Sequence, residues 1–531
     1  MHGDGFRNVV DPALAARYRA EGWWGDTTLA DHVAEHVRLR PDAAAYVTPH
    51  GRVTWAEYDA AADRIAGALV AHGLEPGARV AVWLPDGATV HAALLANEKA
   101  GFTTVGIGAR AGDEEVRHVL HKTGATALVT HEHHRDRDAA EIVDTLGPDL
   151  ALRHHLVVPR VEDGPLDGFP VLGGEAAARR RMGPDDLFMI NSTSGTTGLP
   201  KCVMHTQNRW MYFHRAAVAA GDLTPGEVIL GAVPAPFGFG LWTAHFTPTL
   251  LGAPCVVLEK FSATAAWDLM EAEGVTMLAA VSTQFILMLA AAEEREPNVE
   301  RLRVMFTGGE AVPYERARAF EARTGAQVLQ FYGSNESGLA TGTRLGDPPE
   351  RRLRTAGRRV DGTELRLFAG GRDVTAEGRG QPGTRGPAVC VGYLEDADAN
   401  RQLFTADGFV LHADICTLDD GWLTVVGRTS DIIIRGGKNI SAAQVEDDVA
   451  AHPSVALAAA VPITDPVFGE RVCVFVELRP GMALTLAGLT AFLDRRGVSK
   501  ERWPERLEVL DALPRSSGGK VAKGELRQRT G

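Results

Sequence analysis

Hydrophobic positions along the first 130 residues alternate between two spacings. Apolar residues that recur three and four positions apart predict helices at residues 29–38, 55–72, 88–100 and 114–121. Short continuous apolar runs predict buried strands between them, at residues 45–47, 79–84, 103–106 and 127–129. Strands that alternate with helices indicate an α/β architecture with largely parallel sheets.

Later apolar runs are followed by polar or glycine-rich segments. Strands are predicted at residues 187–190, 304–306, 328–331 and 423–426. Loops at the ends of adjacent parallel strands are where open α/β sheets bind nucleotides. Beyond residue 431, a helix at 445–451 and a strand at 471–477 predict a compact α+β unit.

Length and composition describe a globular protein of several units. A chain of 531 residues is too long for one ordinary core, so two or three packed units are expected. Its 45% hydrophobic and 23% charged residues exclude disordered and fibrous classes. A formal charge of −13 argues against a nucleic-acid partner, which requires a basic face.

No targeting or membrane segment is visible. The start, Met1 to Gly5, lacks a basic and then apolar signal pattern, and the apolar stretch at 278–292 is too short to span a bilayer. A cytoplasmic location is therefore expected. Five cysteines without C-x-x-C spacing predict buried free thiols, and the histidines at 131, 133, 134, 154 and 155 fit a solvated surface better than a metal site.

The most informative segment is Ser192-Thr-Ser-Gly-Thr-Thr-Gly-Leu-Pro-Lys201, which follows a predicted strand. Glycines allow backbone N–H groups to approach an anion, hydroxyls donate further hydrogen bonds, and Lys201 supplies a positive charge. The pattern predicts a polyphosphate site. It is not the P-loop of kinases and GTPases, because Pro200 and Cys202 break the G-x-x-x-x-G-K-[ST] spacing.

This segment resembles the phosphate loop of the adenylate-forming superfamily, which contains acyl-CoA synthetases, peptide-synthetase adenylation domains and luciferases. The resemblance extends along nearly the whole chain. It implies an α/β fold, with a large N-terminal domain of mixed, mostly parallel sheets flanked by helices, and a small mobile α+β C-terminal domain. The implied boundaries are 1–428 for the large domain, 429–430 for the hinge at Ser430, and 431–531 for the small domain.

Nucleotide-binding residues are implied by the same resemblance. In Tyr332-Gly-Ser-Asn-Glu336, the tyrosine stacks on adenine and Glu336 holds Mg²⁺, with Asn335 in place of the usual Thr. Asp414 accepts the ribose hydroxyls. The implied nucleotide set is Ser194, Gly195, Thr196, Thr197, Gly198, Lys201, Gly309, Glu310, Tyr332, Gly333, Asn335, Asp414 and Arg428.

The terminal motif and the segment after the hinge imply two further roles. Lys520, with Gly518 in place of the usual Ser, is similar to the catalytic lysine of the superfamily, which acts with Thr193 and Glu336. The coenzyme A residues are implied to be Arg435, Gly436, Gly437 and Lys438.

The acid-binding residues are implied to be Phe237, Gly238, Trp242, Gly333 and Gly338. Phe237 stands where similar proteins often have His, and Gly238 beside it leaves space. An apolar pocket without a countercharge favours a hydrophobic, ring-bearing monocarboxylic acid over acetate or a zwitterionic amino acid.

The resemblance implies an AMP-forming acyl-CoA synthetase that uses ATP, Mg²⁺ and coenzyme A. Two alternatives stay open. One is a freestanding adenylating enzyme that loads a separate carrier protein, and the other is a nucleotide-binding protein without catalysis. The sequence leaves the acid unidentified and the oligomeric state open, with a dimer among the options.

Overall fold

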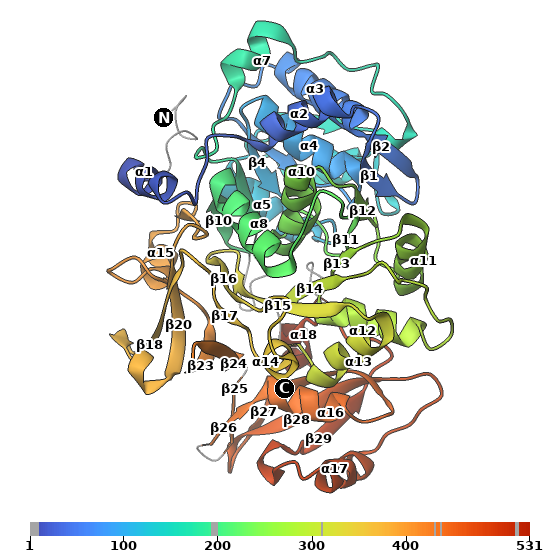
Figure 1. Cartoon of the computed structure of the whole chain (residues 1–531), viewed down its shortest axis with the longest axis vertical. Coiled ribbons are helices and arrows are strands. Elements are labelled where there is room, and N and C mark those ends of the chain that lie inside the picture. Colours follow the sequence, from blue (N-terminus) through green and yellow to red (C-terminus); the bar gives the residue numbers. More distant parts are fainter. Residues whose placement is uncertain are drawn as a thin grey trace.

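The computed structural model describes residues 10–192, 200–309, 312–428, 432–435, 438–515 and 520–530. Two parts are distinguishable in Figure 1: a large upper part built from the first four-fifths of the chain, and a small lower part built from its last hundred residues. Two large sheets form the upper part, and one smaller sheet forms the lower part.

The first sheet has seven strands, and both of its faces are covered. Val80 and Val82 of one strand pack into the core that contains α3 (Trp55–Ala71) and α4 (Ala88–Lys99), whereas Ala81 packs towards α5 (Asp113–Thr123). Five neighbouring strands are parallel, as expected for a sheet buried on both faces. The strand order is β21 (Gly392–Tyr393), β10 (Cys202–His205), β9 (Met189–Ser192), β4 (Thr103–Gly106), β3 (Arg79–Val82), β5 (Ala127–Thr130) and β8 (His154–Val157).

The second sheet runs the length of the large part. Its middle strands, from β1 to β15, are parallel, and the strands beyond β15 are antiparallel. The order is β19 (Arg372–Asp373), β18 (Glu364–Ala369), β20 (Arg379–Arg385), β23 (Asp414–Asp419), β24 (Trp422–Arg428), β17 (Arg358–Arg359), β16 (Gly338–Gly342), β15 (Gln327–Ser334), β14 (Val304–Gly308), β13 (Met277–Ala279), β11 (Ile229–Gly231), β12 (Cys255–Val257), β1 (Ala44–Thr48) and β2 (Gly51–Thr54), with β22 (Val410–Leu411) paired to β20.

Further helices complete the large part. A second core forms where Trp267, Phe285 and Phe320 from three helices pack under the long sheet. These helices and the others are α1 (Pro12–Ala20), α2 (Leu29–Leu39), α6 (Ala139–Thr145), α7 (Gly174–Arg180), α8 (Gln207–Gly221), α9 (Gly238–Gly240), α10 (Thr247–Leu251), α11 (Ala263–Glu273), α12 (Ser282–Ala291), α13 (Tyr314–Thr324), α14 (Pro349–Arg354) and α15 (Ala397–Leu403).

The small part is a twisted sheet with helices on its two faces. Successive side chains of a strand point to opposite faces of the sheet. Val472 and Val474 pack against α16 and α17 on one face, whereas Phe475 packs with Leu526 of α18 on the other. The elements are β25 (Ile432–Arg435), β26 (Lys438–Ser441), α16 (Ala442–Ala450), β27 (Val455–Asp465), β28 (Gly469–Leu478), α17 (Leu486–Arg495), β29 (Arg506–Val509) and α18 (Lys523–Gln528). The α/β fold with a small α+β domain is confirmed.

Polar contacts join the two parts. Arg316 Nη2 donates to the carbonyl oxygens of Ala450 and Val455, each at 3.0 Å, and Arg479 Nη1 lies 2.5 Å from Glu293 Oε1. Helix α12 packs beside β27 in the same region (Figure 1). The domain boundaries at 428 and 431 stay predictions, and Ser430 lies outside the described residues.

Three other expectations concern cysteines, membranes and histidines. All five cysteines are buried free thiols, as predicted. No helix within the described ranges is long and apolar enough to cross a membrane. The solvated interpretation of the histidine cluster is wrong for His134, which is buried and stacks on Trp83 with ring centroids 3.8 Å apart. Burial lowers the pKa of His134 to about 4.

Candidate active site

Lys520 of the small domain reaches the large domain at the end of β14. Its Nζ donates to the carbonyl oxygen of Gly309 at 2.5 Å. Gly309 has φ of +78°, a conformation that favours glycine, and a Cβ there would lie 3.0 Å from the ammonium. The predicted catalytic lysine is therefore placed beside a predicted nucleotide-binding glycine, at the carboxyl edge of the parallel strands.

Tyr332, near the end of β15, meets Asp414, the first residue of β23. The Tyr332 hydroxyl donates to Asp414 Oδ2 at 2.8 Å, and its ring stacks on His412 with centroids 5.1 Å apart. Burial, with a smaller contribution from Asp414, raises the pKa of Tyr332 above its ordinary value. Tyr332 consequently remains a neutral donor that orients the carboxylate predicted to accept the ribose hydroxyls.

Glu336 and Lys201 are linked through a residue that the sequence analysis did not identify, Tyr393. Its hydroxyl donates to Glu336 Oε1 at 2.7 Å, and Lys201 Nζ lies 4.7 Å from the centre of its ring. Burial first, and then Glu336, raise the pKa of Tyr393. The contact between Lys201 and the ring is a cation–π interaction that holds the ammonium near the carboxylate.

Glu336 fits the predicted magnesium site as a single protein ligand. Within the ranges that the structure describes, no three His, Cys, Asp or Glu side chains are grouped as metal ligands. Mg²⁺ is commonly held by one or two carboxylates together with substrate phosphates, so a lone carboxylate near Lys201 suits this mode.

Two of the predicted acid-binding residues, Phe237 and Gly238, lie in close contact with Gly108 and with Asn335. The ring of Phe237 packs on Gly108, where a Cβ would lie 2.6 Å from it, and a Cβ on Gly238 would lie 2.4 Å from Asn335 Oδ1. Trp242 is fully buried and stacks on Phe213 at 4.7 Å, so it supports this region from within the core.

Gly333 and Gly338 permit a tight bend between β15 and β16. A Cβ on Gly333 would lie 1.8 Å from the carbonyl oxygen of Gly338, and the two strands change register between Tyr332 and Gly333. A larger residue at Gly333 would separate β15, which carries Tyr332, from β16 and so disturb the turn that carries Glu336.

Most of the predicted phosphate loop lies outside the described residues. The predicted residues outside them are Thr193, Ser194, Gly195, Thr196, Thr197, Gly198, Glu310, Gly436, Gly437 and Gly518, and the side chains of Arg428 and Lys438 are also not described. Arg435, predicted to bind coenzyme A, pairs with Glu505 and donates to the carbonyl oxygen of Glu501 at 2.6 Å.

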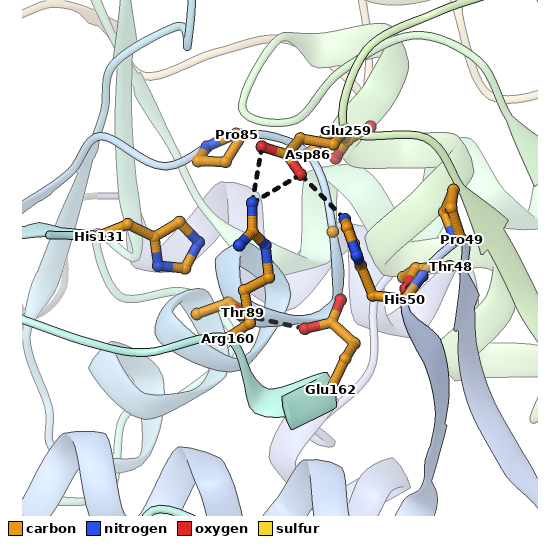
Figure 2. A pocket seen from close by; sticks show the side chains of 11 residues that line it. Thr48, Pro49, His50, Pro85, Asp86, Thr89, His131, Arg160, Glu162 and Glu259 are labelled. Carbon is orange, nitrogen blue, oxygen red and sulfur yellow. Dashed lines mark hydrogen bonds and ion pairs between the residues drawn. The ribbon is translucent and has the colours of Figure 1, made fainter. Parts of the chain in front are cut away.

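A separate polar cavity lies at the carboxyl ends of β1, β5 and β12 (Figure 2). Glu259 accepts from Arg160 at 3.0 Å and lies 3.2 Å from His50 Nε2. Asp86 and His131 also line the cavity. The opposite charges of Arg160 and Glu259 pair within it, and its lining residues are not among the predicted nucleotide, acid or coenzyme A residues.

Comparison with known proteins identifies the family. Residues 33–394 match the AMP-binding enzyme family, and residues 444–520 match the AMP-binding enzyme C-terminal domain. The chain belongs to the AMP-binding enzyme family. The resemblance inferred from Ser192–Lys201 and the later motifs is thereby confirmed, and both matched regions contain residues of the candidate site.

Curated members of the AMP-binding enzyme family align over nearly the whole chain. The medium-chain fatty-acid–CoA ligase of Escherichia coli (strain K12) is 32% identical, covering 97% of this chain and 92% of its own length. The salicyl-AMP ligase / salicyl-S-ArCP synthetase of Mycobacterium tuberculosis is 32% identical, covering 97% and 93%. The solved structure of ATP-bound MatB from Rhodopseudomonas palustris has a TM-score of 0.79 at 26% identity, covering 94% of this chain and 98% of that one.

Proposed function

We propose that the protein is an AMP-forming acyl-CoA synthetase for a hydrophobic, ring-bearing carboxylic acid. The observation that carries the proposal is the contact between Lys520 and Gly309, because it puts a cation from the small domain where the end of β14 meets Tyr332 and Asp414. The similarity to a fatty-acid–CoA ligase and to a salicyl-AMP ligase supports both the reaction class and an apolar acid.

In the first half-reaction, a carboxylate oxygen attacks the α-phosphorus of ATP. A new O–P bond forms, and the bond to the β-phosphate breaks with release of pyrophosphate. Negative charge develops on the phosphate oxygens, and Lys520 and Lys201 supply fixed cations for it. Mg²⁺ bound at Glu336 would supply further charge neutralisation. Asp414 and Tyr332 hold the nucleoside, which fixes the direction of attack.

In the second half-reaction, the thiol of coenzyme A attacks the acyl carbon and AMP leaves. In this half-reaction Lys520 is proposed to withdraw from the reacting centre, so that the thiol can reach the acyl carbon. The small domain therefore has to move, which breaks the contact with Gly309 and the contacts from Arg316 and Arg479. Arg435 and Lys438 belong to the β25–β26 hairpin, which is proposed to face coenzyme A after this movement.

A carrier protein is the alternative acyl acceptor. The specific observation in its favour is the similarity to the salicyl-AMP ligase / salicyl-S-ArCP synthetase. With one pre-made acyl-adenylate, thioester formed on coenzyme A supports the synthetase, whereas thioester formed only on a holo-carrier protein supports the alternative.

The test of the proposal is a panel of carboxylic acids with ATP, Mg²⁺ and coenzyme A. Acyl-CoA and AMP should form in equal amounts, with ring-bearing and medium-chain acids ahead of acetate and amino acids. Binding of AMP without acyl transfer for any acid would instead support a nucleotide-binding protein without catalysis.

A further inference from the structure

Arg209 is a fully buried arginine beneath the candidate site. It lies at the start of α8, and only 1% of its surface is exposed. Its guanidinium lies 4.8 Å from the centre of the Trp210 ring and has three hydrogen-bond partners. Nε donates to the carbonyl oxygen of Ala388, Nη2 donates to the carbonyl oxygen of Asn335, and Nη1 contacts His205 Nδ1. None of these partners is a carboxylate. Burial lowers the pKa of Arg209 to about 10, and the nearby Glu336 carboxylate acts in the opposite direction and favours the cation. Because a buried cation is costly, its position beside Glu336 points to a role in the site.

The hydrogen bonds from Arg209 continue in one direction to the loop that carries Phe237. His205 Nε2 lies 2.7 Å from Asn191 Oδ1, and Asn191 Nδ2 donates to the carbonyl oxygen of Pro236 at 3.4 Å. A neutral imidazole that donates from Nε2 must accept at Nδ1, where Arg209 donates. Burial, and then Arg209, lower the pKa of His205 well below its ordinary value, which keeps the ring neutral.

The two carbonyls held by Arg209 belong to the other walls of the site. Asn335 precedes Glu336, and its side chain lies against Gly238. The Ala388 carbonyl lies against Gly338, where a Cβ would be 2.5 Å from it. Arg209 thus connects the loop that carries Phe237, the turn that carries Glu336, and the segment at Ala388 that packs against Gly338.

We propose that Arg209 is a positioning residue that fixes the shape of the acid pocket, and thereby the choice of acid, through simultaneous hydrogen bonds to Asn335, Ala388 and His205. The inference rests on the proposed function and assigns a determinant of specificity within it. Arginine suits the role because its planar fork donates in three fixed directions, whereas lysine carries the same charge as a point.

The experiment compares Arg209→Lys with wild type by acid-dependent pyrophosphate exchange. The readout is the ratio of kcat/KM for the preferred acid to kcat/KM for the poorest acid with a measurable rate. We expect this ratio to fall about ten-fold, since a loosened pocket discriminates less between acids.

Arg215→Lys is the matched control. Arg215 lies on the same helix, is exposed, and donates to the carbonyl oxygens of Gly22 and Trp23, away from the site. The ratio of kcat/KM values for the two acids in Arg215→Lys should equal that of wild type. A purely structural role for Arg209 lowers kcat for both acids equally and leaves the ratio unchanged, and that result would overturn the inference.

A second variant, Asn191→Leu, cuts the chain of hydrogen bonds at the opposite end and guards against misfolding of the first. It should lower the ratio in the same direction, and the double variant should lose less than the product of the two single effects, because both act through one chain of contacts. If the ratio in the double variant falls by the full product of the two single effects, that result contradicts a shared chain of contacts. If no acid in the panel supports pyrophosphate exchange by the wild-type protein, that result refutes the proposed function instead.

Discussion

The Tyr332 hydroxyl donates to Asp414 Oδ2 at 2.8 Å, although the residues are 82 positions apart. The bond restrains the orientation of the Asp414 carboxylate. A ribose diol needs a carboxylate in one fixed orientation, and Tyr332 supplies that orientation while its ring is stacked on His412.

Tyr332→Phe should weaken AMP binding about three- to ten-fold, because it keeps the ring and removes one hydrogen bond to a charged acceptor. Calorimetric titration with AMP measures the change. Tyr314→Phe is the matched control, since that hydroxyl donates to Glu350 at the same distance of 2.8 Å on the exposed face of the protein. Equal affinity of Tyr332→Phe and wild type would contradict the role given to Asp414.

Lys520→Ala should nearly abolish acyl-adenylate formation and spare thioester formation from a supplied acyl-adenylate. The reason is that Lys520 is proposed to lie at the reacting phosphate only while it contacts Gly309. Pyrophosphate exchange and coenzyme A acylation are measured separately. Lys523→Ala, which removes an ammonium paired with Glu446 at 2.7 Å, should leave both rates near wild type. Equal loss in both half-reactions would refute the assignment of Lys520.

Gly238→Ala should reduce exchange on the order of 10²-fold, because the new Cβ would lie 2.4 Å from Asn335 Oδ1 and displace the loop before Glu336. Asn335→Gly in the same chain removes the clashing atom and should recover part of the rate. The nearby Trp210, 3.0 Å from that Cβ, limits the recovery. Full activity of the Gly238→Ala single variant would show that the loops are not in contact during catalysis.

The buried carboxyl group of Asp86 should make the stability of the protein depend on pH. The residue is 3% exposed, and burial raises the pKa of its carboxyl group to about 8. Its neighbour His91, 3.6 Å away, stays neutral because burial lowers its pKa to about 3. Between about pH 4 and pH 8 the folded chain retains a proton that the unfolded chain has lost. The contribution of Asp86 to the free energy of unfolding is therefore at its maximum below about pH 4 and is lost as the pH rises to about 8.

Asp86→Asn removes that dependence. Relative to wild type, the variant should gain stability as pH rises from 4 to 8, by at most about 1.4 kcal/mol per pH unit. Thermal unfolding across this range measures the difference. Asp136→Asn, at an exposed position, is the control and should follow wild type throughout. A constant difference between Asp86→Asn and wild type would mean that Asp86 is ionised in the folded protein.

The sequence predicted the fold class and most central elements because periodicity records burial directly. The strand at 103–106 and the start of the helix at 88 agree with β4 and α4. The resemblance to the adenylate-forming superfamily also implied that Tyr332, Glu336 and Asp414 belong to one region. It could not show Tyr393 or Arg209, since their contacts with Glu336 and Asn335 depend on how distant loops approach each other. No local pattern records such an approach.

The edge of the long sheet has a consequence for synthesis of the chain. Strand β1 (Ala44–Thr48) pairs in parallel with β12 (Cys255–Val257), more than 200 residues later. On the ribosome, Tyr46 and Val47 therefore emerge long before their partner strand exists. Until then these apolar residues need protection from other nascent chains, and such long-range pairing is slow to form. Early arrest of translation should accordingly yield fragments that aggregate. In the finished protein, by contrast, Tyr46 of this strand is buried.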